Sequence, residues 1–112
     1  MKEYKFPLRR PNGGDCGLIE DYLDILQSSI YSNGKFFRKF VPSFFQNSEE
    51  KKSSWRKATQ HMEEILSDLD IKIDTSNGFE DILVLKAYND VQARTKFDSF
   101  FTSIYEVSSR YK

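Results

Sequence analysis

The chain has 112 residues, and its 17 lysines and arginines balance its 17 aspartates and glutamates. A net charge of zero argues against a dedicated nucleic-acid-binding protein, because such proteins carry an excess of basic residues that contact phosphate. The single cysteine excludes an internal disulfide framework. The length fits one hydrophobic core, so we expect residues 1–112 to form a single globular domain.

The sequence shows no leader pattern and no apolar run long enough to cross a membrane. It also lacks the Asn-x-Ser/Thr acceptor of N-glycosylation. From these patterns we expect a cytoplasmic protein without a membrane partner.

Residues 1–14 are predicted to form an extended N-terminal arm. Apolar and polar side chains alternate between Tyr4 and Leu8, which is a strand-like pattern. Pro7 restricts any strand there to the edge of a sheet. A Pro-Asn-Gly-Gly turn follows, so we expect the first helix to begin after this arm.

Three long segments, residues 16–32, 48–69 and 91–110, have the apolar period of amphipathic helices. Each of the three begins near a residue suited to an N-cap, namely Asp15, Asn47 and Asn89. In the third segment Gln92 has the capping-box position relative to Asn89.

The densest apolar segment is residues 36–45, which contain five of the ten phenylalanines, in pairs four positions apart. This spacing favours a helix, and Pro42 would break a helix interior, so we expect a short helix near 35–41 and a kink or second turn near 42–46. Its expected partner is the other aromatic cluster, which comprises Phe97, Phe100, Phe101, Ile104 and Tyr105.

Residues 71–85 allow two interpretations. Ile71 and Ile73 alternate with polar residues and Asn77-Gly78 is a hairpin turn, which favours two paired strands. Glu80 and Asp81 in a first turn favour a helix over 79–88 instead. We prefer the helix, which makes the fold class mainly α, a compact bundle of four to five helices, with the hairpin (α+β) as the alternative.

Acidic residues are concentrated in two parts of the chain. Residues 63–81 hold seven acidic side chains against one lysine, and residues 15–24 hold four with no base. Such blocks attract a basic protein partner. The predicted partner-binding residues are Glu63, Glu64, Asp68, Asp70, Asp74, Glu80 and Asp81, together with Glu20, Asp21 and Asp24.

No catalytic residues emerge from the sequence. His61 is the only histidine, so His61, Glu64 and Asp68 would need further ligands to hold a metal. Cys16 lies at a helix start, where a thiolate is favoured, but it would need His61 as its base. We therefore expect a protein that is not an enzyme and has neither metal nor cofactor.

These patterns together predict a small inhibitor that binds a protein, most concretely an immunity protein that neutralises a basic, nuclease-type toxin. A phage-encoded anti-defence inhibitor fits the same physics. An exposed aromatic residue would anchor the contact, with Tyr22, Tyr31 and Trp55 as candidates.

Two alternatives remain, and the oligomeric state is open. One is a structural subunit of a larger assembly. The other is a helical nucleic-acid-binding regulator, although the net charge disfavours nucleic acid. Its contact residues would be Lys51, Lys52, Arg56 and Lys57.

Overall fold

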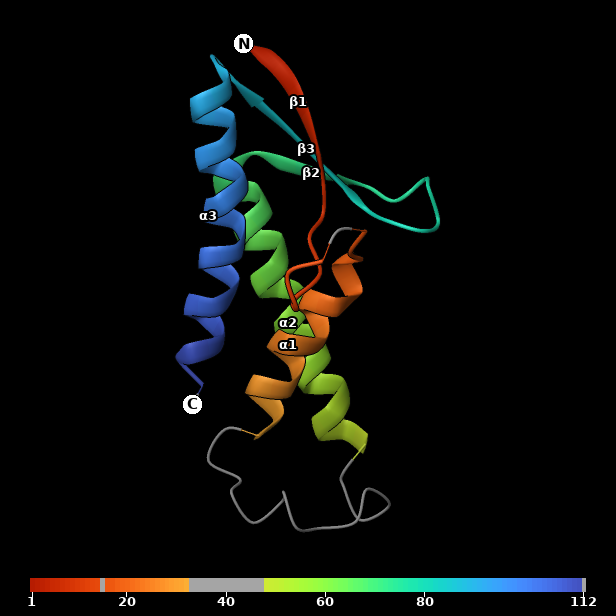
Figure 1. Cartoon of the computed structure of the whole chain (residues 1–112). Coiled ribbons are helices and arrows are strands. Elements are labelled where there is room, and N and C mark those ends of the chain that lie inside the picture. Colours follow the sequence, from red (N-terminus) through yellow and green to blue (C-terminus); the bar gives the residue numbers. More distant parts are fainter. Residues whose placement is uncertain (15, 33–47, 112) are drawn as a thin grey trace.

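The computed structural model describes residues 1–14, 16–32 and 48–111. These residues form three helices and a three-stranded sheet (Figure 1). The helices are α1 (Ile19–Ser32), α2 (Ser48–Leu69) and α3 (Asp90–Ser109). The strands are β1 (Lys2–Pro7), β2 (Ile71–Asp74) and β3 (Ile82–Ala87).

This α+β architecture contradicts the predicted mainly α bundle of four to five helices. Residues 82–87 form the central strand, so the helix predicted over 79–88 is wrong. Part of the predicted N-terminal arm is strand β1. The run Ile82–Leu85 suits a helix or a strand equally by composition, and strand partners on both sides decide in favour of the strand.

The sheet has the order β1-β3-β2, with both neighbouring pairs antiparallel. β2 and β3 form the hairpin that the sequence left open as the alternative. Gly78 in their connection has φ +82°, a conformation that glycine adopts without strain. Pro7 is the last residue of β1, which is an edge strand, as the sequence predicted.

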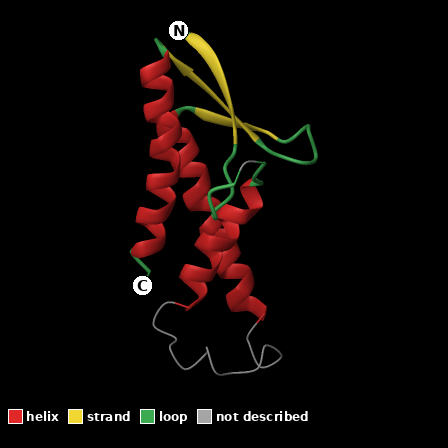
Figure 2. Cartoon of the chain, in the orientation of Figure 1, coloured by secondary structure: helices red, strands yellow, loops and turns green. Residues whose placement is uncertain are grey.

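The sheet lies at one end of the three helices (Figure 2). α1 and α3 run away from it, and α2 runs back toward it (Figure 1). The aromatic cluster of α3 packs against β1 and α1: Phe97 stacks on Phe6 with ring centroids 4.7 Å apart, and Phe101 lies 5.4 Å from Tyr22. The core therefore joins strand and helices through α3.

The predicted boundaries of the second and third long helices agree closely with α2 and α3. Asn89 caps α3, because its Oδ1 accepts a hydrogen bond of 2.9 Å from the Gln92 N–H. The Gln92 side chain in turn accepts from the Tyr88 N–H at 2.7 Å. The short helix near 35–41, the second turn near 42–46 and the Asp15 and Asn47 caps lie outside the described residues, so the expected packing of residues 36–45 on the aromatic cluster of α3 lies outside them too.

Candidate functional site

The structure divides the predicted acidic residues between two surfaces. One group lies on α2 and just after its end and comprises Glu63, Glu64, Asp68 and Asp70, all exposed. The other lies on α1 and the β2–β3 hairpin and comprises Glu20, Asp21, Asp24, Asp74, Glu80 and Asp81. Of the second group, Asp21 and Asp24 line a large cleft.

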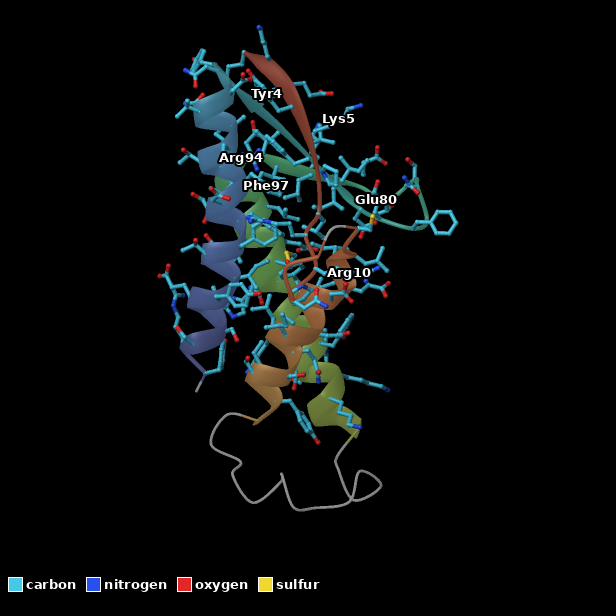
Figure 3. All side chains as sticks on the ribbon, viewed as in Figure 1. Tyr4, Lys5, Arg10, Glu80, Arg94 and Phe97 are labelled. Atoms are coloured by element: carbon cyan, nitrogen blue, oxygen red, sulfur yellow. The ribbon has the colours of Figure 1, made fainter. Side chains whose placement is uncertain are left out.

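This cleft lies at the beginning of α1 and has a volume of about 570 Å³. Asp21 and Asp24 line it from the helix, Arg10 from the preceding loop, and Phe79 from the hairpin. The Phe79 side chain is 86% exposed. Figure 3 shows Arg10 near the start of α1 and Glu80 on the connection between β2 and β3. An aromatic ring next to two carboxylates is suited to a cationic side chain.

Backbone contacts between distant segments hold this cleft together. The Gly17 N–H donates to the Leu8 carbonyl at 2.7 Å, and the Asp81 N–H donates to the Gly17 carbonyl at 3.0 Å. A Cβ on Gly17 would lie 2.5 Å from the Arg9 carbonyl oxygen, so only glycine allows this approach. The start of α1 is thus fixed between the end of β1 and the start of β3.

Two of the predicted contact residues also accept hydrogen bonds at the start of α1. Asp81 is 5% exposed, and its Oδ2 accepts a 2.7 Å hydrogen bond from the Ile19 N–H. Asp21 accepts from the Leu18 N–H at 3.3 Å. Asp81 thus satisfies an N–H group of the first turn, which has no partner within the helix, and Asp21 satisfies that of the residue just before it. Asp24 and Glu20 remain exposed on the same helix.

Asp74 also has a local structural role. Its Oδ1 accepts hydrogen bonds from the Ser76 hydroxyl at 2.6 Å and the Ser76 N–H at 3.0 Å. These bonds, and to a lesser degree the charge of Lys5, lower the pKa of the Asp74 carboxyl. Asp74 thus organises the start of the β2–β3 connection as an Asx turn.

The α2 group borders a smaller groove of about 220 Å³ between α2 and α3. Glu64 and Asp68 line it together with His61, Glu106 and Arg110. Glu106 pairs with Arg110 at 3.2 Å. Both the groove and the α1 cleft carry both signs of charge, but no Phe, Tyr or Trp side chain of the described residues lines the groove, whereas Phe79 lines the cleft.

The structure changes the choice of aromatic anchor. Tyr22 is 1% exposed and its hydroxyl donates to the Arg9 carbonyl at 2.6 Å, so it belongs to the core. Tyr31 is half-buried, and Trp55 is 41% exposed. Phe79, which was not among the predicted anchors, has the most exposed aromatic side chain among the described residues. Its position directly after the Asn77-Gly78 turn was the signal that would have placed it at a hairpin tip.

The structure does not place Cys16, the candidate nucleophile, beside His61, its candidate base. Cys16 lines the α1 cleft, whereas His61 lines the α2–α3 groove, where its Nε2 lies 2.8 Å from the Tyr111 hydroxyl oxygen. Within residues 1–14, 16–32 and 48–111, no three His, Cys, Asp or Glu side chains are grouped to hold a metal ion. No helix of this part is long and apolar enough to cross a membrane.

Comparison with known proteins identifies no protein similar to this chain. No protein-family model, no curated protein and no solved structure matches the chain.

Proposed function

We propose that this chain is a small non-enzymatic protein-binding inhibitor, and most concretely a cytoplasmic immunity protein that neutralises a basic, nuclease-type toxin. The observation that supports it is the α1 cleft, in which Asp21 and Asp24 lie beside the exposed ring of Phe79. A phage-encoded anti-defence inhibitor would use the same surface.

The chemistry of the cleft fits a basic side chain of the partner. The ammonium or guanidinium group is attracted by the carboxylates of Asp21 and Asp24, and its aliphatic part packs on Phe79. Arg10 adds a donor for a neighbouring carbonyl or carboxylate of the partner. Glu20 and Glu80 flank this contact and raise the rate of encounter with a basic surface.

The test is a pull-down from lysate of the native cell, with recovered proteins identified by mass spectrometry. Wild type should retain a basic protein. A variant carrying Glu20→Gln, Asp24→Asn and Glu80→Gln should lose it, because three negative charges leave the cleft region. This variant spares Asp21 and Asp81, whose carboxylates cap α1.

A matched control removes three charges from the other acidic surface, with Glu63→Gln, Glu64→Gln and Asp68→Asn. It should retain the partner. With the purified partner, Phe79→Ala should weaken binding by about 2 kcal/mol, as expected for an aromatic anchor. Equal retention by wild type and both charge variants would refute an acidic contact surface.

One observation favours the nucleic-acid-binding regulator as a second candidate. Lys51, Lys52 and Arg56 on α2, with Gln27 of α1, surround Trp55 in a groove of about 680 Å³. A partly exposed indole among basic groups can stack on a base while the cations hold phosphate. Recovery of nucleic acid by wild type, and its loss on Lys51→Gln with Arg56→Gln, would favour this function over the inhibitor.

A further inference from the structure

The outer edge of β1 offers a second interaction surface, separate from the α1 cleft. β1 is hydrogen-bonded to β3 on one side, and no strand of the described residues lies on its other side. Its outer backbone groups therefore remain available for pairing with another strand. Figure 3 shows Lys5 pointing away from α3 on this strand.

The direction of these backbone groups follows from one hydrogen bond. The Leu8 N–H donates to the Asp81 carbonyl at 2.9 Å, in continuation of the β1–β3 register. Peptide groups alternate in direction along a strand, so those of even-numbered residues 2–8 face β3. Glu3, Lys5 and Pro7 then direct theirs to the outer edge. Pro7, which has no N–H, occupies an outward position, where an edge strand tolerates it.

We propose that this edge pairs antiparallel with β1 of a second copy of the chain, with Tyr4 opposite Tyr4. In this register Glu3 lies opposite Lys5 of the second copy, and symmetry repeats the contact. Opposite charges facing one another across strands stabilise the pair. A two-fold axis through Glu3 or through Lys5 instead would place like charges opposite each other.

The backbone supports the same register. Glu3 and Lys5 both face outward, so each pair exchanges two N–H···O=C bonds, four in all across the dimer. Pro7 lies opposite Met1 and ends the pairing, because it has no N–H to donate. The two three-stranded sheets become one continuous sheet in the order β2-β3-β1-β1-β3-β2.

The side chains of Glu3 and Lys5 lie on the solvent-facing side of the sheet. Both residues are exposed, and Lys5 contributes to the lowered pKa of Asp74, after the Ser76 hydrogen bonds. On the other side Tyr4 and Phe6 face α3, where Phe6 stacks on Phe97. Changing the charges of Glu3 and Lys5 thus leaves the core contacts of β1 intact.

Sedimentation equilibrium of the purified full chain, from about 1 µM to about 1 mM, tests the proposal. Wild type should show a monomer–dimer equilibrium. Glu3→Lys alone and Lys5→Glu alone should each raise the dissociation constant at least about tenfold, because two attractive pairs become repulsive. An unchanged thermal midpoint shows that each variant folds.

Two further experiments test whether Glu3 faces Lys5 of the second copy, as this register requires, or whether the reversed charges weaken the dimer without facing each other. An equimolar mixture of the two single variants should form heterodimers, and the double reversal Glu3→Lys with Lys5→Glu should recover the wild-type constant. A wild type that stays monomeric throughout the range would overturn the proposal. A dimer that neither reversal weakens would also overturn it.

Disulfide trapping tests the axis directly. In a Cys16→Ser background, Tyr4→Cys should oxidise to a covalent dimer, since facing residues of a non-hydrogen-bonded pair lie about 4.5 Å apart at Cα. Lys2→Cys lies far from its own copy in this register and should stay monomeric. Equal cross-linking at both positions would contradict the predicted register.

Discussion

Tyr22 shows how the core uses a polar side chain of α1. Its ring contacts Phe101 and Phe100 of α3, and its hydroxyl donates to the Arg9 carbonyl. Burial, which is the largest cause, raises the pKa of Tyr22 from 10.0 to about 12. The folded state therefore favours the neutral phenol, which keeps this hydrogen bond.

The raised pKa predicts a loss of stability in alkali. For a group whose pKa is higher in the folded state, the stabilisation is complete below the unfolded pKa of 10.0 and is lost as the pH rises toward about 12. The free energy of unfolding therefore falls as the pH rises through this range. Urea unfolding between about pH 8 and about pH 11 measures it.

Tyr22→Phe is the matched control, since it removes only the ionisable hydroxyl. Its free energy of unfolding should be lower near neutral pH by about 1 kcal/mol, the value of one hydrogen bond. It should then fall less steeply than that of wild type above pH 10. Parallel curves for the two proteins would show that other groups cause the alkaline loss.

At the scale of the element, α1 depends on a residue distant in the chain. Its first turn receives the Asp81 carboxylate from the start of β3, in addition to the local Asp21. The sheet fixes the position of the Asp81 carboxylate, and this acceptor helps to determine where α1 begins. The same contact explains why Asp81, although acidic, is buried.

Asp81→Ala should therefore lower the free energy of unfolding by about 1–2 kcal/mol, because the Ile19 N–H loses its acceptor in a partly buried position. Asp81→Asn should lower it less, since the amide oxygen can accept the same bond. Asp24→Ala, an exposed change on the same helix, should have little effect. Denaturant unfolding compares the three variants, and equal losses at both positions would exclude the capping role.

At the scale of the whole molecule, Phe97 joins the sheet to the helices. It stacks on Phe6 of β1 and meets Phe101 edge-on, with centroids 5.0 Å apart. The guanidinium carbon of Arg9 lies 4.8 Å from the centre of its ring, and that of Arg94 lies 5.3 Å from Phe6. These rings and guanidinium groups connect β1 to α3 through aromatic and cation–π contacts.

Phe97→Ala should destabilise the protein by about 3–5 kcal/mol, as expected for removing a buried ring. Because the ring contacts both parts, circular dichroism and the fluorescence of Trp55 should report one coincident transition at a lower denaturant concentration. Phe79→Ala is the control, since its ring is 86% exposed and its loss should leave the midpoint unchanged. Two separate transitions in Phe97→Ala would show that sheet and helices unfold independently.

The sequence by itself determined the features that depend on neighbouring residues. The boundaries of α2 and α3, the Asn89 cap and the edge position of Pro7 follow from local patterns. The hydrogen bonds of a helix join residues four positions apart, so the period and the cap carry the information.

Tertiary structure decided the features that need distant partners. Residues 82–87 are a strand because β1 and β2 pair with them on both sides, and β1 comes from the opposite end of the chain. Asp81 caps α1 across 62 positions, which placed it in the core rather than on the predicted acidic surface. The α1 cleft likewise combines a loop, a helix and a hairpin tip. Strand pairing and side-chain caps join residues far apart in sequence, so no local pattern specifies them.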